Sequence, residues 1–302
     1  MLRYLLIAFG SSWAIAGLLW WLGPGLHVGL RTALLTLYMF GPALAAVLAQ
    51  RAAGEPVLGP LAVRLRPNRW WLLAWLLPLA LQPLVLGVAL LHPDVSLSLD
   101  FSGLFARLAA SLPPEQVAQA RAQLEAMPPA VLALALSVQP LVAGATINAL
   151  AAFGEELGWR GWLHRHWSGL GFWRRSVLVG AIWGLWHAPI ILQGHNYPQH
   201  PVLGVGLMVV FCVLLAPLHE LVRVRGGSVW AAAVLHGSVN ASAGASLLFL
   251  AGGDDLWVGF TGGAGMVVLA GAIGALALID RLRGGRWTAP AKEFVQDGPH
   301  TS

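Results

Sequence analysis

The chain has 302 residues, of which 57% are hydrophobic and only 10% are charged, and its mean hydropathy is +0.70. Soluble domains carry about a quarter charged residues, so this composition excludes a water-exposed globular domain and indicates an integral membrane protein. The net charge of +5 comes almost entirely from arginine, because Lys292 is the only lysine. The arginines lie between apolar segments, which favours a role in membrane topology over nucleic-acid binding.

Apolar segments recur along the chain, each close to the roughly 20 residues that a helix needs to cross the hydrocarbon core. The first continues past Ala14 and Ala16 into Trp20, which favours a retained helix over a cleaved signal peptide. We predict an all-α fold, a polytopic transmembrane helical bundle of about eight spans. The predicted spans are 4–22, 30–50, 70–91, 130–153, 176–193, 202–222, 229–250 and 258–279.

The basic residues predict the orientation of this bundle, because cytoplasmic loops carry an excess of arginine and lysine. With the N-terminus inside, all but three of the 18 basic residues fall in cytoplasmic segments, the exceptions being Arg31, Arg107 and Arg121. We therefore expect both termini in the cytoplasm. The longest segment outside the membrane, 92–129, is then external, and its apolar residues recur at helical spacing, which predicts a short amphipathic helix on the outer surface.

Ionisable side chains are costly inside a span and are therefore candidates for function. Counting helical residues from the flanking arginines places Glu155, His187 and His236 about 15, 18 and 16 Å into the membrane. Three separate helices thus bring a carboxylate and two imidazoles to one depth. Asn240 follows His236 by four residues and Trp183 precedes His187 by four, so each pair shares a helix face. The sequence predicts a site at this depth.

The adjacent glutamates have different surroundings. Glu156 and Arg160 are four residues apart, and their attraction lowers the cost of burying both. Glu155 lies about 100° round the helix, without that partner, and is free to act on water. We include Glu156 among the candidate catalytic residues, with Arg160 and Trp183 as supporting residues; a purely structural role for Glu156 stays open.

Two imidazoles and a carboxylate permit two chemistries, and the residues alone leave both open. His187 and His236 could hold a zinc ion, with Glu155 as general base on the metal-bound water and the Asn240 amide stabilising the oxyanion. Alternatively, Glu155 and His187 could activate water without a metal, leaving His236 and Asn240 to stabilise the oxyanion.

Other ionisable groups are set aside at this stage. His219 and Glu220 begin like the zinc motif H-E-x-x-H, but Arg223 stands where the second histidine is required, so no metal site is expected there. His195 and His200 fall in a segment predicted to be external, and we leave them out of the site.

The three segments resemble the CPBP family of intramembrane metalloproteases, which contains the type II CAAX prenyl proteases and bacteriocin-processing or immunity proteins. The family signature is E-E-x-x-x-R, then F-x-x-x-H, then H-x-x-x-N. The matching residues are Glu155, Glu156 and Arg160, then His187, then His236 and Asn240. Trp183 stands where the family usually has phenylalanine. The resemblance covers residues 130–245.

The resemblance implies a helical intramembrane fold with Glu155 as the catalytic glutamate. His187, His236 and Asn240 would complete a site in a cavity reached from the cytoplasmic side. We predict an endopeptidase that hydrolyses a peptide bond of a membrane-associated substrate by glutamate-activated water, with zinc as the expected cofactor. Membrane lipid and a peptide entering from the membrane or the cytoplasmic side are the expected partners, and nucleic acid is not.

The alternative is a non-catalytic immunity or chaperone protein that binds a peptide on the same scaffold; the intact set of site residues favours the enzyme. The arginine-rich, lysine-poor composition indicates a bacterial protein of the inner (cytoplasmic) membrane. We divide the chain into N-terminal helices with the outer amphipathic segment (1–129), a catalytic core (130–250), a last helix with its basic flank (251–287) and a disordered tail (288–302).

Overall fold

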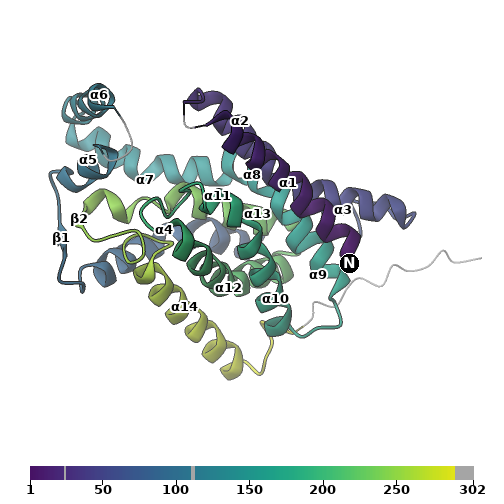
Figure 1. Cartoon of the computed structure of the whole chain (residues 1–302). Coiled ribbons are helices and arrows are strands. Elements are labelled where there is room, and N and C mark those ends of the chain that lie inside the picture. Colours follow the sequence, from purple (N-terminus) through teal and green to yellow (C-terminus); the bar gives the residue numbers. More distant parts are fainter. Residues whose placement is uncertain (24, 110–112, 290–302) are drawn as a thin grey trace, which may run out of the picture.

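A computed structural model describes residues 1–23, 25–109 and 113–289, and these residues are mostly helical (Figure 1). Two short strands, β1 (Val95–Leu97) and β2 (Leu250–Gly252), pair antiparallel. The α-helices are α1 (Leu2–Leu22), α2 (Val28–Met39), α3 (Gly41–Ala52), α4 (Arg69–Ala89), α5 (Ser102–Ala109), α6 (Pro114–Glu125), α7 (Pro129–Ala145), α8 (Ile147–Glu156), α9 (His164–His166), α10 (Phe172–Trp186), α11 (Ala188–Ile191), α12 (Pro201–Gly226), α13 (Val229–Ser242) and α14 (Gly263–Leu282). A π-helix, η1 (Leu157–Leu163), and a 3-10 helix, η2 (Ser246–Phe249), complete the set. The predicted all-α fold class is confirmed.

Six helical segments in the described part of the chain are long and apolar enough to cross a membrane, or up to seven if the bent pair α6 and α7 forms one span. This is fewer than the eight predicted spans, because two predicted positions hold broken helices. The span predicted at 130–153 breaks at Thr146, whose φ of −119° and ψ of −99° are not helical. The span predicted at 176–193 divides at His187, two residues before Pro189, which cannot continue the hydrogen-bond pattern.

The segment that carries the two glutamates is a continuous helical rod. Elements α8, η1 and α9 follow one another without interruption from Ile147 to His166, so the helix continues towards Arg165 as the depth estimate required. Glu155 and Glu156 are the last residues of α8, immediately before the π-helical stretch. π-Helical stretches are rare in proteins, and those that exist are often found at functional sites.

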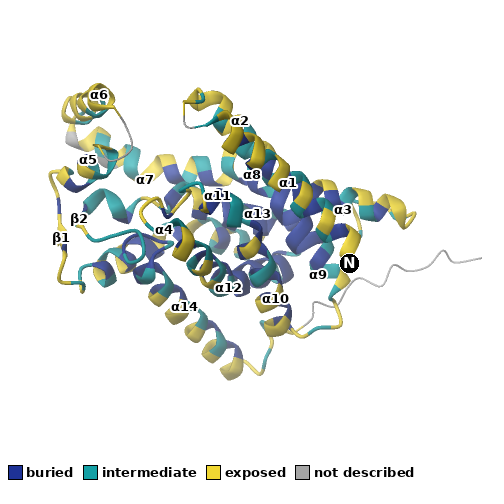
Figure 2. Cartoon of the chain, viewed as in Figure 1, coloured by how far each residue is buried: buried dark blue, intermediate teal, exposed yellow. Residues whose placement is uncertain are grey.

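Glycines allow the helices of the core to approach closely. A Cβ atom at Gly180 would lie 2.7 Å from Val213 Cα, and one at Gly184 would lie 2.5 Å from Val209 Cα. These glycines are four residues apart on α10, so one face of that helix packs directly on the backbone of α12. On α13, a Cβ at Gly237 would lie 2.4 Å from a carbonyl oxygen of α7. Figure 2 shows the result: the buried residues gather around α8, α10, α12 and α13.

The bundle has two ends of different charge. At one end Arg165 pairs with Glu55, Arg64 donates to the Gly227 carbonyl, and Arg225 donates to the Trp287 carbonyl. We call this the basic end; its basic residues include Arg51, Arg64, Arg66, Arg69, Arg165, Arg174, Arg175, Arg223, Arg225, Arg281, Arg283 and Arg286. The opposite end carries β1, β2, α5 and α6 (Figure 1).

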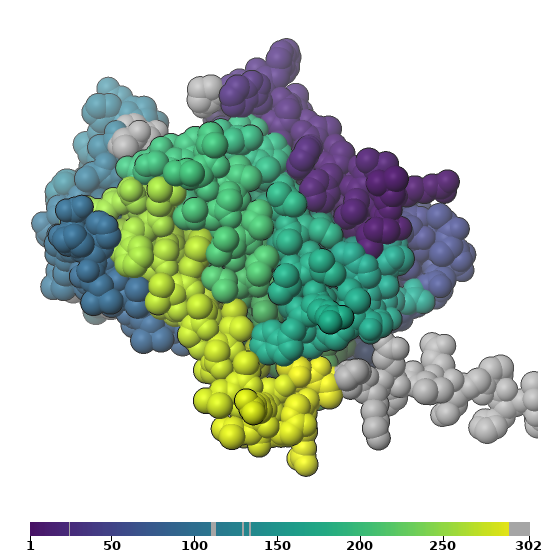
Figure 3. Space-filling view, turned by 60° about the horizontal axis from the view of Figure 1, so that its bottom comes forward, coloured from purple at the N-terminus to yellow at the C-terminus, as the bar shows by residue number. Residues whose placement is uncertain are grey.

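The helix predicted in the outer segment is present as α6, and a bend of 106° separates it from α7; its amphipathic character and its place on the membrane surface stay predictions. The orientation of the bundle and the division into 1–129, 130–250, 251–287 and 288–302 stay predictions. From residue 290 onward the predicted disordered tail lies outside the described residues. Figure 3 shows α10 to α12 between the purple N-terminal helices and the yellow C-terminal helix.

Candidate active site

A cavity of about 330 Å³ lies within the bundle, and the structure brings most of the predicted site residues to its wall. It is lined by Glu155 from α8, Trp183 from α10, His187, and His236 and Asn240 from α13. The other lining residues are Leu35, Tyr38, Met39, Trp186, Ile190, His195, Asn196, Met208, Phe211, Cys212, Leu215, Val239, Ala243 and Thr261. Glu156 and Arg160 do not line it.

Glu155 is held at the inner wall of this cavity. Its side chain is 3% exposed, and one carboxylate oxygen, Oε2, accepts a hydrogen bond of 2.6 Å from Trp183 Nε1. The other oxygen, Oε1, lies 4.0 Å from His236 Nε2. A buried carboxylate that keeps one oxygen towards a cavity is suited to act as a base on a bound water.

Glu156 faces the other side of the His236 ring. Its Oε1 atom accepts a hydrogen bond of 3.0 Å from Arg160 NH1 and one of 2.9 Å from His236 Nδ1. The Arg160 guanidinium also lies 4.6 Å from the ring centroid of Trp183. Because a carboxylate only accepts, Nδ1 carries the proton in this bond, and Nε2 is the nitrogen left facing Glu155. Glu156 thus orients His236 without reaching the cavity.

His187 and Tyr38 complete the wall through bonds to backbone carbonyls. His187 Nδ1 lies 2.8 Å from the Trp183 carbonyl, so Nδ1 is the protonated nitrogen and Nε2 keeps its lone pair. The Tyr38 hydroxyl donates to the Trp186 carbonyl at 2.5 Å. No sequence motif surrounds Tyr38, so sequence reasoning did not select it. It reaches the cavity wall because α2 contacts the end of α10.

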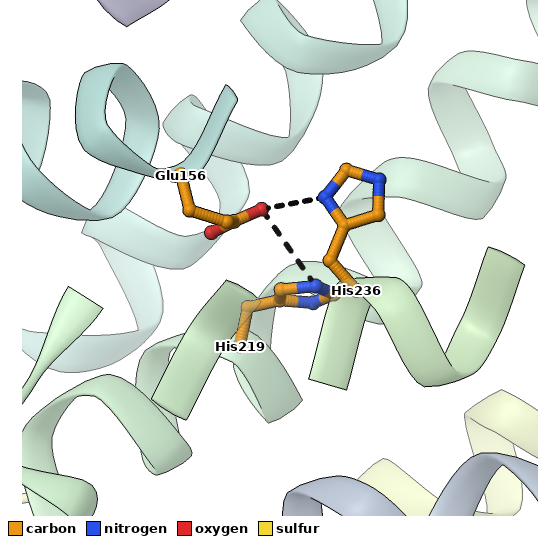
Figure 4. Close-up of side chains that lie close together, drawn as sticks. All are labelled: Glu156, His219 and His236. Atoms are coloured by element: carbon orange, nitrogen blue, oxygen red, sulfur yellow. Dashed lines mark hydrogen bonds and ion pairs between the residues drawn. The ribbon is translucent and has the colours of Figure 1, made fainter. Parts of the chain in front are cut away.

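His219 lies beside the predicted site residues, although we excluded it from the predicted site because its zinc motif is incomplete. It is fully buried on α12, its ring packs edge-on against Trp183 and His236 at 5.2 and 5.7 Å, and its Nε2 lies 3.8 Å from Glu156 Oε1 (Figure 4). The available signal was a histidine inside a long apolar helix. Glu220, by contrast, pairs with Arg175 at the basic end, at 2.7 Å.

His195 also corrects the prediction, because it lines the cavity together with Asn196. Both residues belong to the segment between α11 and α12 that was predicted to be external, and both are exposed. His200, which was left out of the site as well, pairs with Asp255 at 2.7 Å and does not line the cavity.

One group among the described residues has the composition and spacing to hold a metal ion, and it consists of Glu156, His219 and His236. This set differs from the predicted ligands His187 and His236, because His187 is not part of the group. A carboxylate and two imidazoles are donors that zinc accepts. Glu156 Oε1 already accepts from Arg160 and from His236 Nδ1, whereas Glu156 Oε2 and His219 Nε2 are buried without a hydrogen-bond partner among the described residues.

A metal ion bound through Glu156 Oε1 and His236 Nδ1 would compete with the guanidinium cation of Arg160 and with the proton on Nδ1. Metal ligation requires deprotonated donors, so the hydrogen bond between Glu156 and His236 would have to break. Glu156 Oε2 and His219 Nε2 are the two atoms of the group that a metal ion could take without displacing a partner, and we derive no chemical step through zinc.

Comparison with known proteins agrees with this geometry. Residues 137–242 match the model of a family described as type II CAAX prenyl endopeptidase Rce1-like. The matched stretch covers about a third of the chain. It contains both glutamates, His187, His219, His236 and Asn240, and the predicted family resemblance is confirmed over it. No curated protein matches the chain. The match to the Rce1-like family and the apolar helices together support an integral membrane protein of the intramembrane-protease type.

Proposed function

We propose that the protein is an intramembrane endopeptidase in which Glu155 activates water for attack on a peptide bond. The observation that carries this proposal is the gap of 4.0 Å between Glu155 Oε1 and His236 Nε2 at the wall of the cavity. A water molecule that bonds to both atoms at about 2.8 Å spans such a gap. The opposite nitrogen of the same imidazole is fixed by Glu156, so the pair is held before a substrate arrives.

The reaction needs one proton to move twice. Glu155 takes a proton from the water while the water oxygen bonds to the carbonyl carbon of the substrate. The carbonyl oxygen becomes negative, and the side-chain amide of Asn240 donates to it. Glu155 then gives the proton to the amine nitrogen as the carbon–nitrogen bond breaks, which restores the carboxylate and releases an acid and an amine.

Two neighbours keep Glu155 ready for this role. The indole N–H of Trp183 holds Oε2, which leaves Oε1 as the oxygen that meets water. Glu156 is neutralised by Arg160 and therefore adds less repulsion to the adjacent carboxylate than a free anion would. Burial makes these interactions stronger than they would be in water.

The predicted mechanism includes a zinc ion as cofactor. If the protein holds zinc, Glu156, His219 and His236 are the residues that would bind it, and zinc would supply an acidified water. The proposed reaction does not require it, because Glu155 reaches the water without any of these three ligands leaving its present partner.

The test is cleavage of membrane-embedded reporter peptides by the purified protein in lipid nanodiscs. Wild type, Glu155→Gln and Asn240→Ala are compared, with bound zinc measured on the same samples. We expect the first variant to lose cleavage and the second to lose part of it. Retained cleavage in Glu155→Gln would refute the role of Glu155. Absence of cleavage over a broad peptide panel, with peptide binding retained in folded protein, would instead support the immunity or chaperone alternative.

We also propose a bacterial cytoplasmic membrane as the location, on the basis of the arginine-rich composition and the apolar helices. Fractionation of the source cells tests this location directly.

A further inference from the structure

The cavity is not centred between the two ends of the bundle. Its lining includes His195 and Asn196 from the loop after α11, and Thr261 from the loop before α14. The lining residues on α13 are His236, Val239 and Asn240, and Ala243 follows the helix end, so all of them lie away from the helix start at the basic end. The described residues that line the cavity include none from the loops of the basic end, so the cavity extends towards the opposite end.

The exposed residues show where the cavity opens. His195, Asn196 and Asn240 are exposed, whereas Glu155 and His236 at the inner wall are 2% and 4% exposed. The path from the surface to the candidate base therefore begins at the end that carries β1, β2 and α6 (Figure 1). The basic end is closed behind the site by buried ion pairs, including that of Arg175 and Glu220.

The charges of the two ends decide which compartment each end faces. Arginine-rich ends of membrane proteins lie in the cytoplasm, because basic segments are retained there during insertion. The end with the cavity mouth carries Arg31, Arg107 and Arg121 and, beside them, Asp94, Asp100, Glu115, Glu125, Asp254 and Asp255. It is therefore the end that faces away from the cytoplasm.

We infer that the site takes its substrate from the extracytoplasmic side. The inference rests on the proposed peptidase function and reverses the expectation of cytoplasmic access. Met208, Phe211 and Leu215 form one apolar wall of the cavity, and no carboxylate other than Glu155 lines it. The matching substrate is the membrane-proximal part of an exported or membrane-inserted peptide, with an apolar side chain beside the cleaved bond. A cytoplasmic C-terminal tail would meet the closed basic end.

The orientation is tested by labelling single cysteines in intact cells with a membrane-impermeant maleimide. Asn196→Cys marks the cavity mouth and Arg174→Cys, an exposed residue of the basic end, is the matched control. Wild type gives the background, because its Cys212 is buried. We expect Asn196→Cys to react in intact cells and Arg174→Cys only after permeabilisation. The reverse pattern would overturn the inference.

Substrate access is tested with two reporters that carry one cleavable sequence on either side of a single span. Both should be cleaved in detergent, and only the extracytoplasmic one in cells. Cleavage of only the cytoplasmic reporter in cells would overturn the access inference and leave the peptidase standing. If neither reporter is cleaved in detergent, the proposed function fails, while cysteine labelling still decides the orientation.

A second cavity lies at the basic end and has a different character. It has a volume of about 690 Å³ and is lined by Arg69, Trp70, Leu282, Gly284 and four further residues, Arg225, Arg283, Arg286 and Trp287. The lower edge of Figure 3 shows the yellow C-terminal part of α14 and the residues after it, which contribute to this cavity. Four guanidinium groups and two indoles thus share one concave surface.

The positive charge of this cavity is balanced only in part, since Asp280 interacts electrostatically with Arg225 at longer range than an ion pair. None of its four arginines has a carboxylate within 4.0 Å among the described residues. Arg225 is fixed by the bond from its Nε to the Trp287 carbonyl, at 2.9 Å, and its NH2 atom is buried without a hydrogen-bond partner. The oxygens of nearby Asp280 accept from Trp287 and Thr288 instead.

We propose that this cavity binds a phosphate group of an anionic lipid in the cytoplasmic leaflet. Guanidinium groups bind phosphate oxygens through paired N–H donors, and a basic pocket between helices on the cytoplasmic side fits an anionic headgroup. Trp70 and Trp287 pack edge-on at 5.2 Å and place their rings where the headgroup meets the acyl chains. This proposal does not depend on the peptidase function.

The test compares thermal unfolding in nanodiscs of phosphatidylglycerol and of phosphatidylcholine. We expect wild type to unfold about 2–4 °C higher in phosphatidylglycerol. Arg225→Gln and Arg283→Gln should each reduce this difference, whereas Arg174→Gln, at the same end but outside the cavity, should keep it. An equal difference in all three variants would refute the site. Stabilisation of wild type by inorganic phosphate in phosphatidylcholine would show that a free anion, rather than a lipid, is the ligand.

Discussion

The Nδ1 atom of His236 lies 2.9 Å from the Oε1 atom of Glu156. This bond occupies one ring nitrogen of His236. The other nitrogen, Nε2, is directed at Glu155, whose Oε1 atom lies 4.0 Å away. The carboxylates of the two adjacent glutamates therefore lie at opposite nitrogens of the same imidazole ring. One reaches the cavity and the other orients the ring, so substitutions of the two glutamates should have different consequences.

We expect Glu155→Gln to lower kcat by about 100- to 10,000-fold, because the general base is lost. Glu156→Gln should lower kcat by about 10- to 100-fold with an unchanged KM, because it acts through His236. Steady-state kinetics on a reporter peptide in nanodiscs measures both values, and thermal unfolding gives the folded fraction. Equal losses in the two variants would contradict the separate roles.

Trp183→Phe should keep the ring packing and remove the hydrogen bond to Glu155 Oε2. We expect kcat to fall about 10-fold and the free energy of unfolding to fall by about 1–3 kcal/mol, as for hydrogen bonds to charged groups. The matched control is Trp75→Phe, which removes an indole bond of 2.8 Å to the Leu141 carbonyl, away from the cavity. It should lose stability without losing kcat; an equal fall in kcat would show that the effect is not specific to Glu155.

Gly184→Val should separate α10 from α12, because a Cβ atom there would lie 2.5 Å from Val209 Cα. Overpacking of this kind costs about 1–3 kcal/mol of unfolding free energy. Gly206→Val on α12 is the control, since no heavy atom lies within 4 Å of its Cβ position. Thermal unfolding should rank wild type and Gly206→Val close together and Gly184→Val clearly lower. Similar midpoints for both variants would argue against the close helix contact.

Arg175→Met should remove the cation bound to Glu220, since the two residues are joined at 2.7 Å and are 8% and 3% exposed; the buried carboxylate keeps the bond with His164 Nδ1, at 2.9 Å. Breaking a buried pair by removing one partner costs about 3–5 kcal/mol. The exposed neighbour Arg174, changed to Met, controls for the loss of a positive charge. A loss of stability as small as in this control would mean that the pair does not hold α10 against α12.

Metal removal should leave cleavage unchanged, because the proposed reaction passes through Glu155 and not through the group of Glu156, His219 and His236. We expect zinc below one equivalent in purified protein and no effect of 1,10-phenanthroline on kcat. Stoichiometric zinc that disappears in His219→Gln, together with inhibition by the chelator, would contradict the metal-free mechanism and identify that group as the zinc site.

The sequence determined the features that depend on local periodicity and hydropathy. Long apolar segments specify membrane helices, and residues four apart share a helix face, so the contact of Glu156 with Arg160 at 3.0 Å was predictable. Counting turns from the flanking arginines placed Glu155, His187 and His236 at one depth. All three line one cavity in the structure.

Only the tertiary structure decided which side chains of separate helices meet. Depth along a helix does not say which neighbour a side chain meets, so His219 entered the site only through the packing of α12 against α10 and α13. The loop after α11 likewise brings His195 back to the cavity, although its position outside the predicted spans had left it out of the site. The side from which the cavity opens, and the nitrogen of His236 that remains for chemistry, follow from contacts between residues far apart in the chain.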